Sequence, residues 1–196
     1  MSDVEQKGKK VLLPMMLGQE YGMEIDDIQA LRDWIALKTI VGECDDSNSI
    51  TISQAAAHAF YNSRTLVDDW QIWIARYCGK DWITRRRHNT YCVDLKENIP
   101  TPGRVKINTQ STAMVGGQLF MLAITTSSEH LKDFDLAPAF DDIFFKIHPN
   151  ADPLDKWPTS EMIGDEGADF FASILNRFFE SQENIRASNV MPRSEA

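Results

Sequence analysis

Apolar residues in the first third of the chain recur at three- and four-residue spacing, which is typical of amphipathic helices. From Glu24 onward this pattern runs through Ile25, Ile28, Leu31 and then Trp34 or Ile35. A second stretch, residues 51–78, contains three consecutive alanines, which favour helix, and ends before Gly79, a residue suited to a helix terminus. We therefore predict a helical subregion over residues 24–79, with two helices between 51 and 78.

After Gly79 the pattern becomes that of extended strands. Residues 90–95 and 111–115 are strand-like, and Gly116-Gly117 separates the second of these from residues 119–124. Two glycines between extended runs favour a hairpin, because both tolerate positive φ. Residues 119–124 are apolar at every position, which indicates a central strand covered on both faces. With a further strand over 142–147, this pattern predicts a small antiparallel sheet within residues 80–148.

The two ends of the chain complete the predicted domain plan. Residues 1–23 are expected to form an extended N-terminal arm, and residues 188–196 a flexible tail. Residues 165–181 carry a wide aromatic stripe at helical spacing, which predicts a closing amphipathic helix within 160–183. The sequence thus predicts a single α+β domain over residues 24–187, with a helical N-terminal half, a sheet in the middle and a C-terminal amphipathic helix.

Composition limits the classes of protein to consider. The three cysteines among 196 residues are widely spaced and form no CxxC pair, which argues against a disulfide framework or a structural zinc site. No apolar stretch approaches the length of a membrane span. We expect a cytoplasmic protein with no cofactor and no membrane partner, and a homodimer is an open alternative.

Charge changes sign along the chain. Residues 79–106 hold seven lysines and arginines against three acids, whereas residues 127–180 hold four against twelve, in a chain of net charge −9. A basic island of this kind attracts phosphate or an acidic partner, while the acidic remainder repels bulk nucleic acid.

One segment resembles the helix-turn-helix of small regulators such as the MerR and excisionase groups. Thr51-Ile52-Ser53-Gln54-Ala55-Ala56 matches the opening of the first helix in those groups, and Ser63-Arg64-Thr65-Leu66 matches the start of the recognition helix. The resemblance implies two packed helices, the second with its N-terminus directed at a DNA phosphate. Phe60 replaces the usual turn glycine, and Asp68 and Asp69 fall on the implied recognition helix, where they would meet phosphate oxygens.

The densest positive cluster is Arg85-Arg86-Arg87, followed by His88. Three guanidinium groups are able to neutralise phosphates or to bind acidic side chains. The alternative is that they balance acids of the same chain. Trp70, Trp73 and Trp82 fit base stacking, but at helical spacing such residues belong more often to a core.

Two further function classes remain open. Asp94 and Lys96 fit the (D/E)xK strand of a broad nuclease fold, in which a carboxylate holds Mg²⁺. The acidic second half suits a protein that binds or inhibits a basic partner protein. Our leading interpretation is a non-catalytic regulatory binding protein that contacts DNA, or another anion, through Arg64, Arg85, Arg86 and Arg87. The alternatives are an acidic protein–protein interaction or inhibitor protein, and third a Mg²⁺-dependent nuclease.

Overall fold

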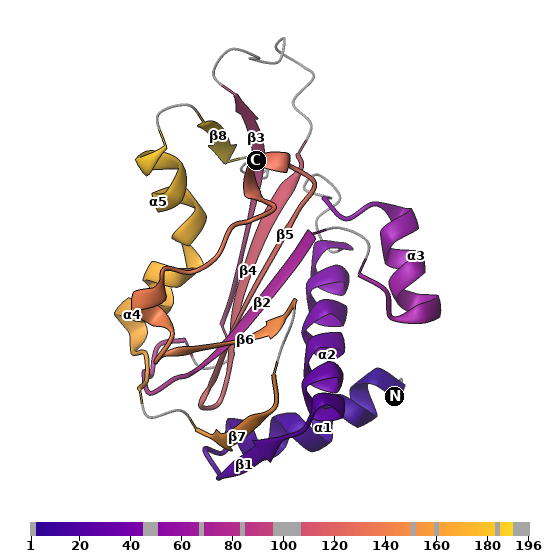
Figure 1. Cartoon of the computed structure of the whole chain (residues 1–196), viewed down its shortest axis with the longest axis vertical. Coiled ribbons are helices and arrows are strands. Elements are labelled where there is room, and N and C mark those ends of the chain that lie inside the picture. Colours follow the sequence, from indigo (N-terminus) through magenta and orange to yellow (C-terminus); the bar gives the residue numbers. More distant parts are fainter. Residues whose placement is uncertain are drawn as a thin grey trace, which may run out of the picture.

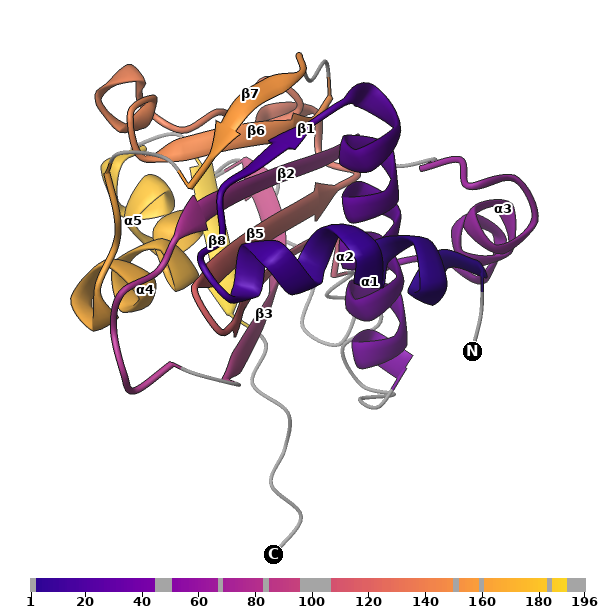
Figure 2. The same cartoon turned by 90° about the horizontal axis from the view of Figure 1, so that it is seen from below.

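The protein is built from one large sheet with helices on both faces, as the computed structural model shows (Figure 1). The structure describes residues 3–44, 51–66, 69–82, 85–95, 107–149, 152–158, 161–182 and 185–189. Helices α1 (Asp3–Met16) and α2 (Ile25–Cys44) lie on one side of the sheet, with α3 (Gln54–Ser63) beside them. Helices α4 (Asp165–Ala172) and α5 (Ile174–Ser181) lie on the other side, and the view from below separates these layers (Figure 2).

The large sheet is antiparallel throughout, and its strand order is β6-β2-β5-β4-β3-β8. Its strands, in chain order, are β2 (Asp69–Arg76), β3 (Arg86–Leu95), β4 (Thr109–Gly116), β5 (Leu119–Thr126), β6 (Phe144–His148) and β8 (Ile185–Asn189). A second sheet pairs β1 (Tyr21–Met23) with β7 (Leu154–Trp157). The predicted α+β class is confirmed.

Strand β5 is the centre of the fold, as its uninterrupted apolar sequence predicts. It pairs with β2 on one side and β4 on the other, and every one of its residues is buried. The predicted β4–β5 hairpin is present, but Gly116 still pairs with Leu119, so the loop consists of Gly117 and Gln118. Gly117 adopts φ 57°, and the backbone of Met16 leaves no space there for a Cβ. Glycine therefore meets both a conformational and a steric requirement of this turn.

Helix α1 corrects the prediction of an extended arm over residues 1–23. Its buried positions are Val4, Gly8, Val11, Leu12 and Met15, which form one helical face. Pro14 lies inside α1, two residues before the helix ends, and lacks the N–H group that would donate to the carbonyl oxygen four residues earlier. A Cβ at Gly8 would lie 2.8 Å from side-chain atoms of Trp34, so the glycine allows α1 to approach α2 closely.

Strand β2 corrects the prediction of helices up to residue 79. Among the described residues of the stretch 51–78, only Gln54–Ser63 is helical, and residues 69–76 form a strand next to the sheet centre. Positions 70 to 75 are all buried, because the strand packs against helices on both faces. Buried Trp70 and Trp73 belong to the core rather than to a base-stacking surface.

The helix predicted within residues 160–183 is present, but it is divided into α4 and α5 and is followed by a strand. The helical pattern is divided at Ser173, whose hydroxyl donates to the carbonyl oxygens of Asp169 (2.8 Å) and Phe170 (3.2 Å). Phe171 and Phe179 are buried against the sheet, as the aromatic stripe predicts. Strand β8 then reaches Asn189, so the first two residues of the predicted tail belong to the sheet, and residues 190–196 lie outside the described residues.

A polar latch fixes α4 to the end of β2. The Asp165 carboxylate accepts hydrogen bonds from the hydroxyl of Tyr77 and from the backbone N–H groups of Lys80 (3.0 Å) and Asp81 (2.9 Å). The Tyr77 oxygen in turn accepts from the Trp82 N–H at 2.9 Å. The hydrogen bond from Tyr77 and those from the backbone lower the pKa of Asp165, whereas burial and the contact with Asp165 raise the pKa of Tyr77 to about 12.

We expect Asp165→Asn to lower the midpoint of thermal unfolding at neutral pH, because a neutral amide accepts these hydrogen bonds more weakly than a carboxylate. Folding lowers the pKa of Asp165 below its ordinary value of 3.8, so this stabilisation is complete above that pH and is lost as the pH falls through the folded-state pKa. Thermal unfolding followed by circular dichroism between neutral and acid pH measures both effects.

The matched control is Glu166→Gln, which removes an exposed charge from the same first turn of α4. Equal losses in the two variants would show that only the charge near the helix N-terminus matters, and would contradict the latch.

Candidate functional site

A groove lies on the surface between α1 and α2. Its volume is about 620 Å³, and it is lined by Glu5, Lys9, Leu12, Leu13, Met16, Trp34 and Lys38. The first five of these residues lie on successive turns of α1, and the last two lie one turn apart on α2. The lining is apolar at its centre and charged at one end, because Glu5 and Lys9 precede the leucines along α1.

The wall that α2 contributes is held by contacts with α1. Lys38 donates to the Glu5 carboxylate at 3.2 Å, and its ammonium lies 5.5 Å from the centre of the Trp34 ring. Trp34 itself is held against Gly8 of α1. These contacts position an aromatic wall beside the leucines before any ligand binds.

Leu13 remains exposed although its neighbours in the chain are packed. Its exposed fraction is 52%, whereas adjacent Leu12 is 5% exposed. Leu17, one turn further, is 58% exposed. Leu13 and Leu17 thus extend the apolar surface of the groove along the solvent-exposed side of α1 and just beyond its end. An exposed apolar surface indicates an interaction site when it is contiguous.

The lining of the groove holds two lysines and one acid, within an acidic chain. Helix α1 holds three lysines and two acids. Lys7 pairs with Asp3 and Lys38 with Glu5, while none of the ion pairs among the described residues involves Lys9. Lys9 therefore presents its positive charge to whatever enters the groove.

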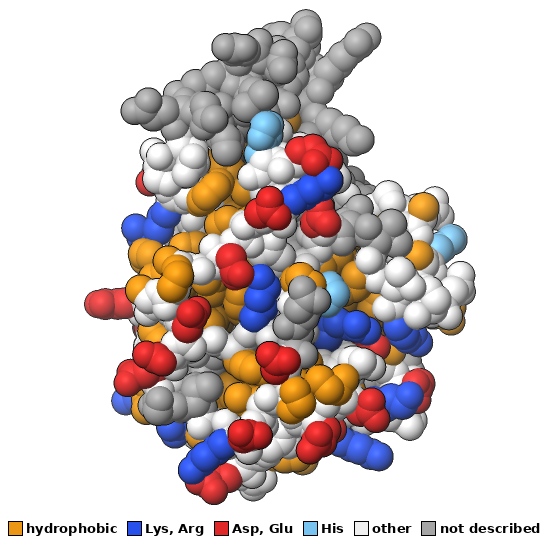
Figure 3. All heavy atoms as spheres, in the orientation of Figure 1, with side chains coloured by type: hydrophobic (Ala, Val, Ile, Leu, Met, Phe, Trp, Pro, Cys, Tyr) orange, Lys and Arg blue, Asp and Glu red, His pale blue; other side chains and the backbone are white. Residues whose placement is uncertain are grey.

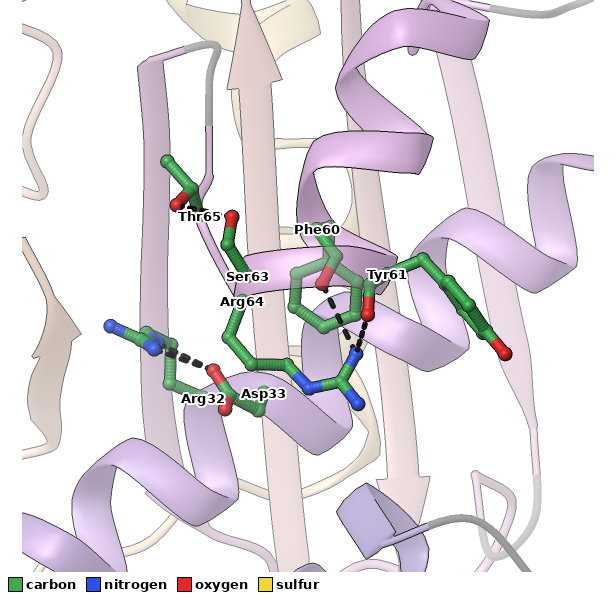
Figure 4. Close-up of polar contacts among 7 residues, drawn as sticks. All are labelled: Arg32, Asp33, Phe60, Tyr61, Ser63, Arg64 and Thr65. Carbon is green, nitrogen blue, oxygen red and sulfur yellow. Dashed lines mark hydrogen bonds and ion pairs between the residues drawn. The ribbon is translucent and has the colours of Figure 1, made fainter.

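Arg64, a predicted DNA contact, serves the end of α3 instead of opening a second helix. It is the C-terminal cap in a left-handed conformation with φ 59°. Its Nη1 donates to the carbonyl oxygens of Phe60 (3.1 Å) and Tyr61 (2.8 Å), and its guanidinium stacks over the Phe60 ring (Figure 4). The chain then runs through Thr65 and Leu66 without helical structure toward β2. The two-helix unit implied by the resemblance to MerR and excisionase proteins is therefore not formed.

The three consecutive arginines are divided by the alternation of a strand. Arg87 points to the α4 side, where its Nη2 lies 3.0 Å from the Asp169 carboxylate and its guanidinium 5.3 Å from the Trp82 ring centre. Arg86 points to the α2 side, where its guanidinium lies against Gly42. Arg85 precedes the strand and is exposed. The structure thus separates Arg86 from Arg87, and contact of Arg64, Arg85, Arg86 and Arg87 with DNA or another anion stays a prediction.

Acidic side chains of the second half are interleaved with cations. Lys132 pairs with Glu129 at 2.7 Å and lies near Asp69 and Asp133, and Lys146 pairs with Asp135 at 2.7 Å. The space-filling view shows the same mixture of red and blue over the face that it displays (Figure 3). An acidic binding surface for a basic partner therefore also stays a prediction.

The nuclease hypothesis depends on side chains that the structure does not describe. The side chains of Asp94 and Lys96, the proposed nuclease pair, lie outside the described residues. His88, which follows the arginines on β3, contacts the Thr112 hydroxyl through its Nδ1 at 2.8 Å. Within the described part of the chain, no group of three or more His, Cys, Asp and Glu side chains is arranged to hold a metal ion.

A buried polar row crosses the α2-facing side of the sheet. Thr90 of β3, Gln110 of β4 and Thr125 of β5 lie side by side, and each is at most 2% exposed. Neither amide atom of Gln110 has a hydrogen-bond partner among the described residues. An apolar side chain of similar size would avoid the cost of burying that amide.

The groove could not be expected from an extended arm over residues 1–23, because the helix α1 forms one of its walls. The available signal was the spacing of Val4, Val11, Leu12 and Met15, which fits one helical face. The lysine-rich stretch between them and Pro14 obscured it.

Comparison with known proteins adds no functional assignment: no family model, no curated protein and no solved structure matches the chain. Among the described residues, no helix combines the length and the apolar character needed to cross a bilayer.

We expect Gln110→Leu to leave the free energy of unfolding unchanged or to increase it, because the variant removes an amide with no protein partner. The control is Thr112→Val in the same strand, which removes the contact with His88 and is expected to cost about 1 kcal/mol. Urea unfolding at neutral pH measures both. A clear loss of stability in Gln110→Leu would contradict the assignment of an unpartnered amide.

Proposed function

We propose that this chain is a non-catalytic binding protein that holds a helical segment of another protein in the groove between α1 and α2. The observation that supports the proposal is the groove itself, with exposed Leu13 beside the fixed Trp34 ring. Recognition of an amphipathic helix in an apolar groove is a recurrent mode of protein binding. As in the sequence-based prediction, the chain is a binding protein. Its proposed partner is now a protein instead of DNA, and its proposed binding surface is the groove instead of the arginines.

The shape of the groove favours a helix as the occupant. Its lining residues on α1 run from Glu5 to Met16, which corresponds to about 16 Å of helix and three turns. An extended apolar wall of this length accepts side chains from successive turns of a docked helix. Trp34 supplies the large rigid side chain that such interfaces favour at their centre.

The Arg64 and Arg87 contacts support a protein partner over DNA. Each guanidinium makes defined contacts within its own chain, with α3 carbonyls in one case and with Asp169 in the other. Salt-dependent DNA binding depends on cations that are available to phosphates. Electrophoretic mobility measurements with mixed-sequence DNA test the earlier prediction separately.

We expect Leu13→Glu to reduce capture of the partner at least tenfold, because it places a carboxylate where an apolar side chain would be buried. The measurement is quantitative mass spectrometry of proteins retained from a cell extract on the immobilised full-length chain. Circular dichroism of the variant verifies that the fold is retained.

The matched control is Met162→Glu, which puts the same charge at an exposed apolar residue beside the α4-side core. The proposal requires that Met162→Glu retain the proteins that Leu13→Glu loses. An unchanged set of captured proteins for a folded Leu13→Glu variant would remove the groove as the binding surface.

A further inference from the structure

The groove has a charged residue beside its apolar centre, and both features restrict which ligand fits. Lys9 and Leu13 both line it and lie one turn apart on α1, about 6 Å along the helix axis. Lys38, the other lysine of the lining, already pairs with Glu5 and contacts the Trp34 ring. Lys9, which has no ion-pair partner among the described residues, therefore lies one helical turn from Leu13 at the apolar centre of the groove.

The α1 helix of a second copy does not satisfy the charge of Lys9 in three simple arrangements. If two α1 helices packed antiparallel with their centre at Leu13, each Lys9 would lie opposite Leu17 of the other copy. Moving the centre to residue 7 would bring Glu5 opposite Lys9, but Leu13 would then lie beyond the end of the other helix. A parallel arrangement places Lys9 opposite Lys9. None of these three α1–α1 arrangements buries the leucines and neutralises the lysine together, which favours an occupant of a different sequence.

We propose that the groove selects an acidic amphipathic helix, whose apolar side chains fill the space between Leu13 and Trp34 and whose carboxylate, one turn away, pairs with Lys9. This inference depends on the proposed function and adds the chemistry of the partner. The carboxylate gives the complex its direction, because a helix docked in the reverse orientation would place its acid toward Met16 and away from Lys9. Complementary charges act in this way on register and specificity more than on affinity.

The test uses two synthetic helical peptides of about 18 residues, long enough to form helix on binding. Both carry the same leucine stripe; one has glutamates a turn away from it, and the other has lysines at those positions. Fluorescence anisotropy of the labelled peptides gives their dissociation constants for the full-length protein. We expect the acidic peptide to bind about tenfold more tightly, since attraction is replaced by repulsion in the basic one.

Two charge reversals on α1 distinguish a direct ion pair between Lys9 and the peptide from the effect of the protein's net charge. Lys9→Glu is expected to reverse the preference, so that the lysine peptide binds more tightly. Lys10→Glu changes the net charge equally at an exposed residue outside the groove lining, and is expected to keep the original preference. Equal effects of the two variants, or equal binding of the two peptides to the wild-type protein, would overturn the inference.

Other outcomes distinguish this inference from the proposed function. If neither peptide binds while Leu13→Glu still loses captured proteins, the acidic-helix inference is wrong and the groove remains a protein-binding surface. If neither peptide binds and decanoate does so in a manner abolished by Leu13→Glu, the occupant is a carboxylate-tipped lipid, and both proposals are wrong.

Discussion

The fold depends on covering both faces of the β5 and β2 strands. Their side chains are apolar in both directions, so a single helical layer would leave half of them in water. Helices α1 and α2 cover one face and α4 and α5 cover the other. This requirement also explains why α1 must be a helix: its Val11, Leu12 and Met15 belong to the same core cluster as Met121 of β5. The groove is a consequence of this packing, since α1 buries one face and leaves Leu13 outside.

The central strand was predictable because its signal did not depend on register. Residues 119–124 are apolar at every position, and a short apolar run that follows two glycines is typical of a buried strand. The same property made β2 ambiguous. Its apolar run also follows a helical Ala-rich stretch, and a strand buried on both faces lacks the alternation that would separate it from a helix. The choice is made by pairing with β5 and β6, which lie far away in sequence.

The predicted site residues show why a cluster in sequence is not a cluster in space. Arg85, Arg86 and Arg87 form one positive patch only if their side chains diverge little, as on one side of a loop. On the described strand, Arg86 and Arg87 point to opposite faces, and Arg87 meets Asp169, 82 residues later in the chain. The order of charges along a sequence contains no information on such a partner. Arg64 likewise donates hydrogen bonds to carbonyl groups of α3, the helix that precedes it.

The position of Lys9 matters because the chain as a whole is acidic. A net charge of −9 repels an acidic partner at a distance, and screening at physiological salt limits that repulsion to about 8 Å. Lys9 therefore acts only on a helix that the apolar contacts have already brought close. Affinity then comes mainly from Leu13 and Trp34, whereas Lys9 selects among the helices that fit them. A basic helix would be attracted by the acidic remainder of the chain, but in the groove it would meet the lysine. Long-range and short-range electrostatics thus oppose each other, which favours selectivity at contact over rapid capture.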